Sequence, residues 1–151
     1  MIFQQAVVQT ADLGASAFRY GLRALGNDSS RVQSASTRSL VGSVALDKVL
    51  RARYPDDPRW DYGIGLKKSA RVSAVWIEVH PASTSEVTTV LNKLKWLKNW
   101  LTNHAPALQK LTGVRSYFWV ATRGVHIRPG SPQARLLQLA GLSLPRKRVE
   151  F

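Results

Sequence analysis

Two alternating segments in the middle of the chain predict a pair of β-strands. In residues 60–66, large apolar side chains occupy every second position, and Asp61 and two glycines stand between them. Residues 72–80 alternate in the same way, with aliphatic residues on one face and Glu78 and His80 on the other. Because successive side chains of a strand point to opposite sides, each acid is expected on the face opposite the aliphatic set.

Apolar residues at helical spacing predict helices around these strands. The strongest pattern, at 87–101, follows a run of hydroxyl residues that can cap a first turn. A second row of side chains on this helix combines Lys93 with Trp96 and Trp100. Core packing or a dimer contact is the favoured interpretation of this row, ahead of a platform on which bases stack. The predicted helices are residues 1–25, 39–54, 87–101 and 132–139.

The remaining segments complete a mixed fold. Strands are expected at 116–122 and around 125–127. Residues 26–39 are polar and rich in serine, so 1–38 is expected to form an N-terminal helix and a polar linker before an α/β domain at 39–151. The length of 151 residues suits one globular domain overall. The expected fold class is α/β (α+β), a small mixed sheet flanked by helices.

The charge points to a class of partner. The chain has 22 Lys and Arg against 9 Asp and Glu, a formal net charge of +13. Such a surface attracts phosphate backbones, so nucleic acid is the favoured partner, ahead of an acidic protein or a membrane surface. The absence of cysteine excludes disulfides and thiolate metal sites and suits the cytoplasm. No apolar run reaches the ~20 residues that a membrane span needs.

Asp61 and Glu78 are candidate metal ligands. If their strands pair as a hairpin, the two carboxylates converge, and such a pair binds a hard divalent cation such as Mg²⁺. The ion can activate water and stabilise charge on a scissile phosphate. His80, on the face of Glu78, is a candidate to orient or deprotonate that water. Gly63 and Gly65 are expected to leave room for a nucleic-acid backbone beside the site.

The order of helix, Asp-bearing strand, Glu-x-His-bearing strand, helix and strand resembles the PD-(D/E)XK nuclease superfamily, which includes restriction endonucleases and Holliday-junction resolvases. The resemblance covers about residues 39–122. It implies a restriction endonuclease-like core and hydrolysis of nucleic-acid phosphodiesters, with DNA favoured over RNA. It also implies that Asp61, Glu78 and the carbonyl of Val79 bind Mg²⁺ or Mn²⁺. Because two-fold dimers are common in this superfamily, a homodimer is one expected state.

The chain departs from the family pattern at three positions. His80 stands where the family usually has lysine, so either His80 suffices or a lysine of the next helix, Lys93 or Lys98, reaches the site. Trp60 stands where the family has proline. Many members carry an acid on the first helix, and Asp47 is the only one available here, although a helix-surface charge is its simpler interpretation.

Basic residues are expected to guide nucleic acid to these acids. The predicted contacts are Lys67, Lys68, Arg71, Lys93 and Arg123. A non-catalytic nucleic-acid-binding or protein-interaction module on the same fold is the alternative, and a factor that neutralises an acidic protein is a third hypothesis. In the simplest alternative, Asp61 and Glu78 lie on a solvated sheet face in exposed ion pairs, worth about 0–1 kcal/mol each.

Overall fold

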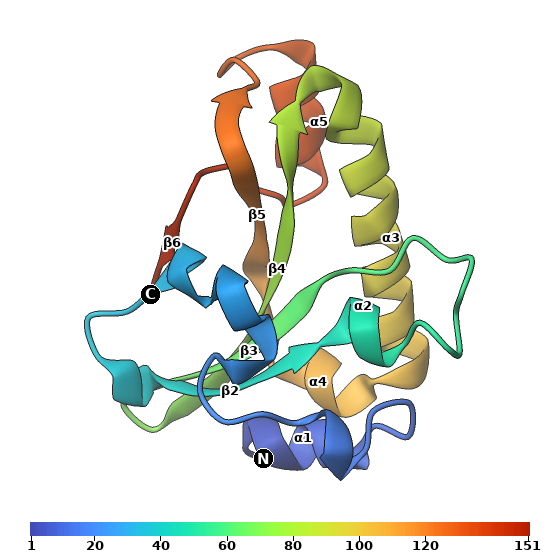
Figure 1. The fold of residues 1–151 in the computed structure, drawn as a ribbon, viewed down its shortest axis with the longest axis vertical. Helices are drawn as coiled ribbons and strands as arrows, with labels where there is room; N and C mark the ends of the chain where they lie inside the picture. The colour runs from blue at the N-terminus through green and yellow to red at the C-terminus, as the bar shows by residue number, and fades with distance from the viewer.

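A four-stranded mixed sheet forms the centre of the fold (Figure 1). The computed structural model describes residues 1–151. In sheet order the strands are β2 (Leu40–Ala45), β3 (Tyr62–Lys68), β4 (Arg71–Ser83) and β5 (Thr112–His126). The first three pair antiparallel and β5 runs parallel to β4, which requires a long crossover connection. The predicted mixed α/β class is therefore confirmed.

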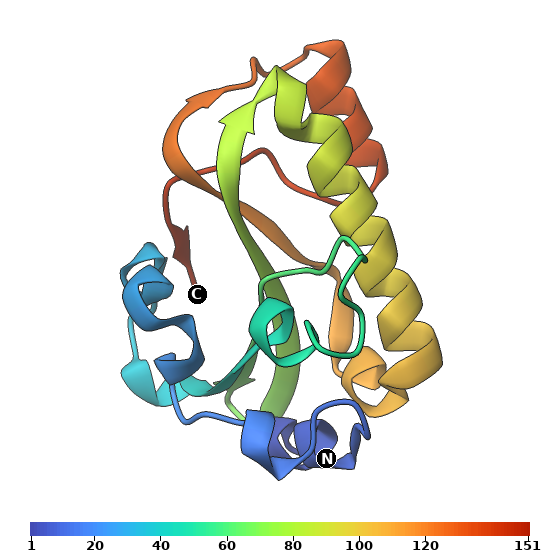
Figure 2. The same ribbon diagram turned by 45° about the vertical axis from the view of Figure 1, so that its right-hand side comes forward.

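Helices supply that crossover and cover the sheet. The helices are α1 (Phe3–Gln9), α2 (Leu46–Val49), α3 (Val87–His104), α4 (Pro106–Lys110) and α5 (Pro132–Leu139). Figure 2 shows α3 running along one side of the sheet, with α5 beside its N-terminal half and α1 near its far end. A second sheet joins β1 (Val32–Gln33) to β6 (Val149–Glu150) in parallel. None of the helices combines the length and apolar character that a membrane crossing requires.

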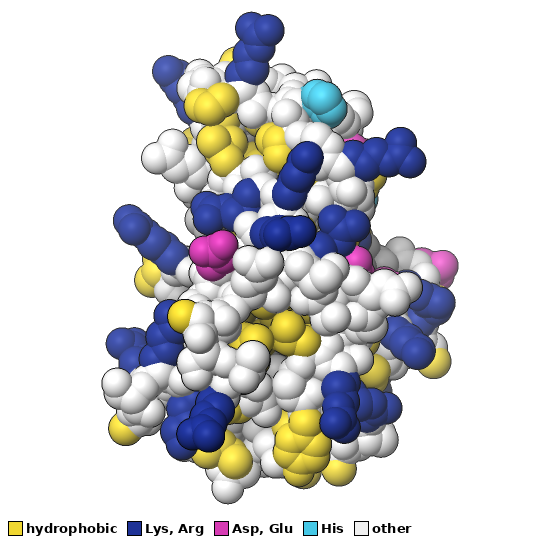
Figure 3. Space-filling model, turned by 60° about the vertical axis from the view of Figure 1, so that its left-hand side comes forward, with side chains coloured by type: hydrophobic (Ala, Val, Ile, Leu, Met, Phe, Trp, Pro, Cys, Tyr) yellow, Lys and Arg dark blue, Asp and Glu magenta, His cyan; other side chains and the backbone are white.

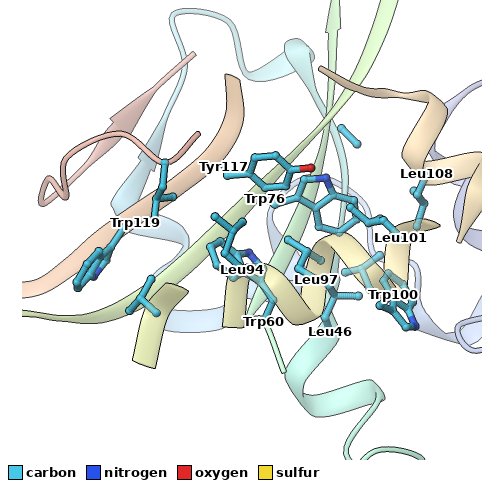
Figure 4. Close-up of a cluster of buried hydrophobic side chains, with 14 of the residues drawn as sticks. Leu46, Trp60, Trp76, Leu94, Leu97, Trp100, Leu101, Leu108, Tyr117 and Trp119 are labelled. Atoms are coloured by element: carbon cyan, nitrogen blue, oxygen red, sulfur yellow. The ribbon is translucent and has the colours of Figure 1, made fainter. Parts of the chain in front are cut away.

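Both faces of the central sheet are buried. On the α3 face, leucines of α3 pack among the tryptophans of the main core, including Trp60 and Trp76 (Figure 4). On the other face, residues such as Ile64 and Ile77 form a smaller core with Leu25. Because residues 76, 78 and 80 share the α3 face, the side chain of Glu78 is turned into the protein rather than toward solvent.

The N-terminal segment joins the same core. Phe3, Val7 and Phe18 are buried in the main cluster. The helix predicted at 1–25 is confined to α1, because the chain turns at Gly14 and Gly21, which have φ of 70° and 53°. The predicted loop at 26–39 is also wrong in part: Arg23–Arg31 is 3₁₀-helical on both sides of a kink at Gly26, and β1 follows it.

The helix predicted at 39–54 is wrong over its first half. Residues Leu40–Ala45 form β2, and only Leu46–Val49 is α-helical. Pairing with β3 over Ala45↔Tyr62 and neighbouring positions overrides the apparent helical spacing. Pro81 does not end β4, which continues to Ser83 through a register shift. Such an irregularity lets a strand contain a proline.

Gly63 and Gly65 make room for core side chains. A Cβ atom on Gly63 would lie 2.5 Å from the Trp76 ring, and one on Gly65 would lie 2.4 Å from the Phe3 ring. These separations are far shorter than carbon–carbon contacts, so neither position tolerates a side chain without movement of an aromatic ring. The expectation that the two glycines give access to a nucleic-acid backbone is wrong, because Trp76 and Phe3 occupy that space.

Candidate functional site

Asp61 and Glu78 meet where the β3–β4 ladder ends. Tyr62 pairs with Ile77, so the next residue outward on each strand is one of the two acids. The N–H of Asp61 donates to Glu78 Oε1 at 3.1 Å, and the N–H of Val79 donates to Asp61 Oδ2 at 2.9 Å. Each carboxylate is therefore held by the backbone of the opposite strand, as convergence of the predicted hairpin requires.

Lys93 brings a positive charge from α3 to both carboxylates. Its ammonium group donates to Glu78 Oε2 and lies 4.0 Å from Asp61 Oδ1. Glu78 is completely buried, while the side chain of Lys93 is 17% exposed. Of the two lysines considered for this place, Lys93 reaches it. Lys98 instead donates to the carbonyl of Ala140 at 2.7 Å.

His80 lies on the outer side of this group between two carboxylates. Its Nδ1 is 3.4 Å from Glu78 Oε2, and its Nε2 is 3.0 Å from Glu86 Oε2. The backbone carbonyl of His80 accepts a hydrogen bond from Trp119 Nε1 at 3.0 Å. The hydrogen bond with Glu78 raises the pKa of His80, burial opposes this rise, and Glu86 adds to it. His80 is thus oriented at both ring nitrogens, and its pKa is raised above the ordinary value.

The Asp61 carboxyl titrates near neutral pH. Burial raises the pKa of Asp61 to about 7, and the negative charge of Glu78 adds to the increase. The charge of Lys93 and the hydrogen bond from the Val79 N–H oppose that increase. A buried acid whose pKa lies in this range can change its protonation state under working conditions, a property common at functional sites.

Three oxygen groups at this point are suited to a hard divalent cation. Asp61 and Glu78 supply carboxylates, the donor type that Mg²⁺ and Mn²⁺ prefer. The Val79 N–H points to Asp61, and because the N–H and C=O of one strand residue face the same edge, its carbonyl also faces that side. No three or more His, Cys, Asp or Glu side chains are grouped as metal ligands. The groups here that could hold a cation are the two carboxylates and the Val79 carbonyl, and Lys93 contacts Glu78 Oε2.

Asp47 belongs to an ion-pair network beside the site. Its carboxylate binds Arg59 at 3.2 Å and Arg51 at 3.0 Å. Its N–H approaches the carbonyl of Asp61 at 3.4 Å, which fixes α2 against the start of β3. The side chain is 34% exposed, in agreement with its interpretation as a helix-surface charge.

The predicted nucleic-acid contacts are divided between two regions. Lys93 is within the site. Arg123 follows Ala121, the β5 partner of His80, by two residues and lines a pocket of about 440 Å³ at that end of the sheet. The hairpin turn that carries Lys67, Lys68 and Arg71 is seven residues from Asp61 along β3, about 23 Å at strand spacing. Of the predicted contacts, Lys67, Lys68 and Arg71 therefore do not lie beside the acids.

Two aromatic residues of α3 belong to the protein's own packing. Trp100 is buried, and Trp96 stacks on it with ring centroids 6.0 Å apart. The indole N–H of Trp96 donates to Asp57, and that of Trp100 donates to Asp12. The core interpretation of this row is confirmed, and stacked bases have no place between these rings.

Glu86 is a residue of the site that the sequence pattern does not reveal. Its partner His80 lies six residues earlier, in β4. The short 3₁₀ segment Thr84–Glu86 turns the chain back and brings the two side chains together. The turn depends on tertiary packing, and a His followed by Glu at this spacing is too common to be a signal.

Positive charge is distributed widely around the molecule. Figure 3 shows the side that carries β6 and the C-terminus in Figure 1, where Lys and Arg side chains are dispersed and acidic ones are few. Comparison with protein-family models, with curated proteins and with solved structures finds no match for this chain.

Proposed function

We propose that the chain is a metal-dependent nuclease of the PD-(D/E)XK type that hydrolyses phosphodiester bonds, in DNA rather than RNA, with Mg²⁺ or Mn²⁺. One observation carries the proposal: Asp61 and Glu78 meet at the end of a β-hairpin with the ammonium group of Lys93 between them. A highly basic protein gains little phosphate affinity from buried acids, so their presence at this point favours a cation-binding role.

The order of elements supports the family resemblance. A helix precedes an antiparallel meander in which Asp61 stands directly before the second strand and Glu78 lies on the third, and α3 then crosses over to the parallel strand β5. Lys93 offers the cation that the family places two residues after the Glu, at the position of His80. Lys93 extends from α3, which packs against β4. The site therefore contains a lysine even though position 80 is a histidine.

Each residue of the site has a part in the proposed reaction. Asp61, Glu78 and the Val79 carbonyl would hold the metal, which would supply an activated water and charge stabilisation at the phosphate. Lys93 places a positive charge where the phosphate charge increases. His80, held by Glu86, would orient the attacking water or other polar groups that enter the site.

The direct test is Glu78→Gln, which keeps the size of the side chain and removes its charge. We expect cleavage of duplex and single-stranded DNA in Mg²⁺ or Mn²⁺ to fall to background, while binding measured in EDTA stays within about twofold. Glu150→Gln, an exposed carboxylate in β6, is the matched control and should cleave normally. Circular dichroism and thermal unfolding check that the variant is folded, and normal cleavage by folded Glu78→Gln would refute the proposal.

A second function, nucleic-acid binding without catalysis, is favoured by the ion pair itself. Glu78 is buried, and Lys93 and His80 already compensate its charge, so the same contacts can serve stability alone. This alternative predicts affinity that decreases steeply with salt and no cleavage with either metal. For both functions we propose a cytoplasmic location, in keeping with the absence of cysteine.

A further inference from the structure

A basic pocket of about 500 Å³ extends along the sheet to Phe118 from the β3–β4 turn, which is at the opposite end of the sheet from the carboxylates. It is formed by the β3–β4 turn, the end of α4 and the first residues of β5. Four cations line it: Lys68, Arg71, Lys110 and Arg115. No acidic side chain lines it, and none of the four cations forms an ion pair within 4.0 Å. The pocket therefore concentrates positive charge that the fold itself does not use.

An irregularity in β5 shapes one wall of the pocket. Ala74 pairs with Thr112 and Trp76 pairs with Tyr117, so four residues of β5 leave the ladder opposite a single residue of β4. This excursion carries Arg115 into an exposed position at the pocket edge. Bulged segments redirect side chains in this way, often beside functional sites.

Aromatic rings form another wall. Phe118 and Phe151 both line the pocket, and their ring centroids are 5.3 Å apart at an angle of 83°. Both are only partly buried. The N–H of Phe151 donates to the carbonyl of Gln33 at 2.9 Å, which fixes the backbone at that ring. The pocket thus combines held aromatic side chains with unpaired cations.

We propose that this pocket binds an unpaired segment of a nucleic-acid strand, with its phosphates on the four cations and a base against the aromatic wall. Cations along a groove with aromatic rings are the combination by which proteins bind single strands. An acidic peptide would need the cations but not the rings, and paired bases would be unable to reach the rings. The pocket volume lies within the ~300–1,000 Å³ of small-ligand sites.

The proposal adds a second contact to the proposed nuclease. Its cations Lys68 and Arg71 lie about 23 Å along the hairpin from Asp61, and its aromatic wall belongs to the smaller core on the other face of the sheet, so it binds a part of the substrate distant from the scissile phosphate. Only this assignment of the bound strand as substrate rests on the proposed function. Binding to the pocket requires neither metal nor cleavage. The pocket proposal and the nuclease proposal can therefore be refuted independently.

The charge test uses a double variant, Lys110→Gln/Arg115→Gln, and a fluorescent 20-nucleotide oligo(dT) in EDTA. We expect the affinity to fall at least tenfold near 50 mM salt, and the slope of log K against log salt to become less steep by about 1.4, because each phosphate contact contributes about 0.7. The control Lys95→Gln/Arg135→Gln removes the same charges from exposed positions on α3 and α5. Equal effects of the two double variants would overturn the proposal.

The base test uses Phe151→Leu, which keeps an apolar side chain and removes the ring. We expect affinity for oligo(dT) to fall at least about fivefold, the lower end of the loss per stacked base, and affinity for an abasic strand of equal length to remain unchanged. An equal loss on both strands would overturn the base contact. Tighter binding of a 20-base-pair duplex or of poly-glutamate than of oligo(dT) would overturn the assignment to an unpaired strand.

These measurements separate failure of the pocket from failure of the nuclease. If Glu78→Gln cleaves normally but Lys110→Gln/Arg115→Gln loses oligo(dT) affinity, the nuclease proposal fails and the pocket stands. If Glu78→Gln loses cleavage and the pocket variants bind normally, the pocket proposal fails alone. Thermal unfolding of each variant confirms that a loss of binding comes from a folded protein.

Discussion

Lys93 on α3 and Glu78 on β4 form an ion pair although Glu78 is completely buried. A buried carboxylate loses its hydration and must recover that free energy from partners of opposite charge and from hydrogen bonds. Glu78 has both, since the Asp61 N–H donates to its second oxygen. The same contacts that make this charge tolerable in the core also gather the groups of the proposed site.

Replacement of Lys93 by Met should remove cleavage and lower stability. The variant keeps an unbranched side chain but leaves Glu78 buried without its main cation, so the free energy of unfolding should fall by about 3–5 kcal/mol. Urea unfolding measures the loss of stability, and a cleavage assay in Mg²⁺ measures the loss of activity. Lys95→Met, two residues away and exposed, is the matched control.

The double variant Glu78→Gln/Lys93→Met separates the two roles of the pair. With neither charge in the core, the free energy of unfolding should recover most of what Lys93→Met loses. Cleavage should stay at background, because both a metal ligand and the cation are missing. A double variant that remained as unstable as Lys93→Met would show that the ion pair is not the cause of the instability.

A lysine at position 80 should partly replace Lys93. His80 already places a ring nitrogen 3.4 Å from Glu78 Oε2, so a lysine on the same backbone reaches that carboxylate. We expect Lys93→Met/His80→Lys to regain measurable Mg²⁺-dependent cleavage, and Lys93→Met/His80→Gln to remain inactive. If the two double variants cleave at the same rate, the prediction that Lys93 acts by placing a positive charge beside Glu78 is wrong.

Asp61→Asn should change how stability depends on pH in metal-free buffer. The carboxyl has a pKa of about 7 in the folded protein and an ordinary value of 3.8. Between these values the folded state holds a proton that the unfolded state has lost, so this residue makes the wild type less stable as the pH rises. Asn removes that contribution and can still accept the hydrogen bond from the Val79 N–H.

The stability of Asp61→Asn relative to the wild type should therefore increase from pH 4 to 7 and level off above pH 7. Urea unfolding at half-unit pH steps in EDTA measures this difference. Asp56 is exposed in the turn before β3, and Asp56→Asn is the control. Its free energy of unfolding should change with pH in the same way as that of the wild type. A constant offset between Asp61→Asn and the wild type would contradict a raised pKa.

Alternation of residue types correctly predicted which side chains share a strand face, but not what covers that face. Glu78 and His80 were expected to lie together, and they do. They were expected opposite a buried aliphatic face, yet α3 buries their side of the sheet as well. Periodicity within one strand contains no information about the element that packs on it, so the full burial of Glu78 had to come from the tertiary structure.

The choice between two lysines depended on packing in the same way. Lys93 and Lys98 both follow the Glu78 strand on one helix, and the sequence allowed either to reach the acids. Lys98 lies more than one turn further along α3, where the carbonyl of Ala140 accepts its hydrogen bond. Which lysine reaches Glu78 thus depends on how α3 packs on β4, which no local pattern in the helix specifies.

The glycines of β3 should prove structural when each is replaced by alanine. The new Cβ of Gly63→Ala would meet the Trp76 ring, and that of Gly65→Ala would meet the Phe3 ring. Overpacking of this kind costs about 1–3 kcal/mol, measurable as a lower urea midpoint. Gly113→Ala, whose Cβ would lie 3.3 Å from the hydroxyl oxygen of Ser116, should cost less. If Gly63→Ala and Gly65→Ala instead kept full stability and lost only DNA binding in EDTA, these positions would admit a ligand, and the core packing described for Trp76 and Phe3 would be wrong.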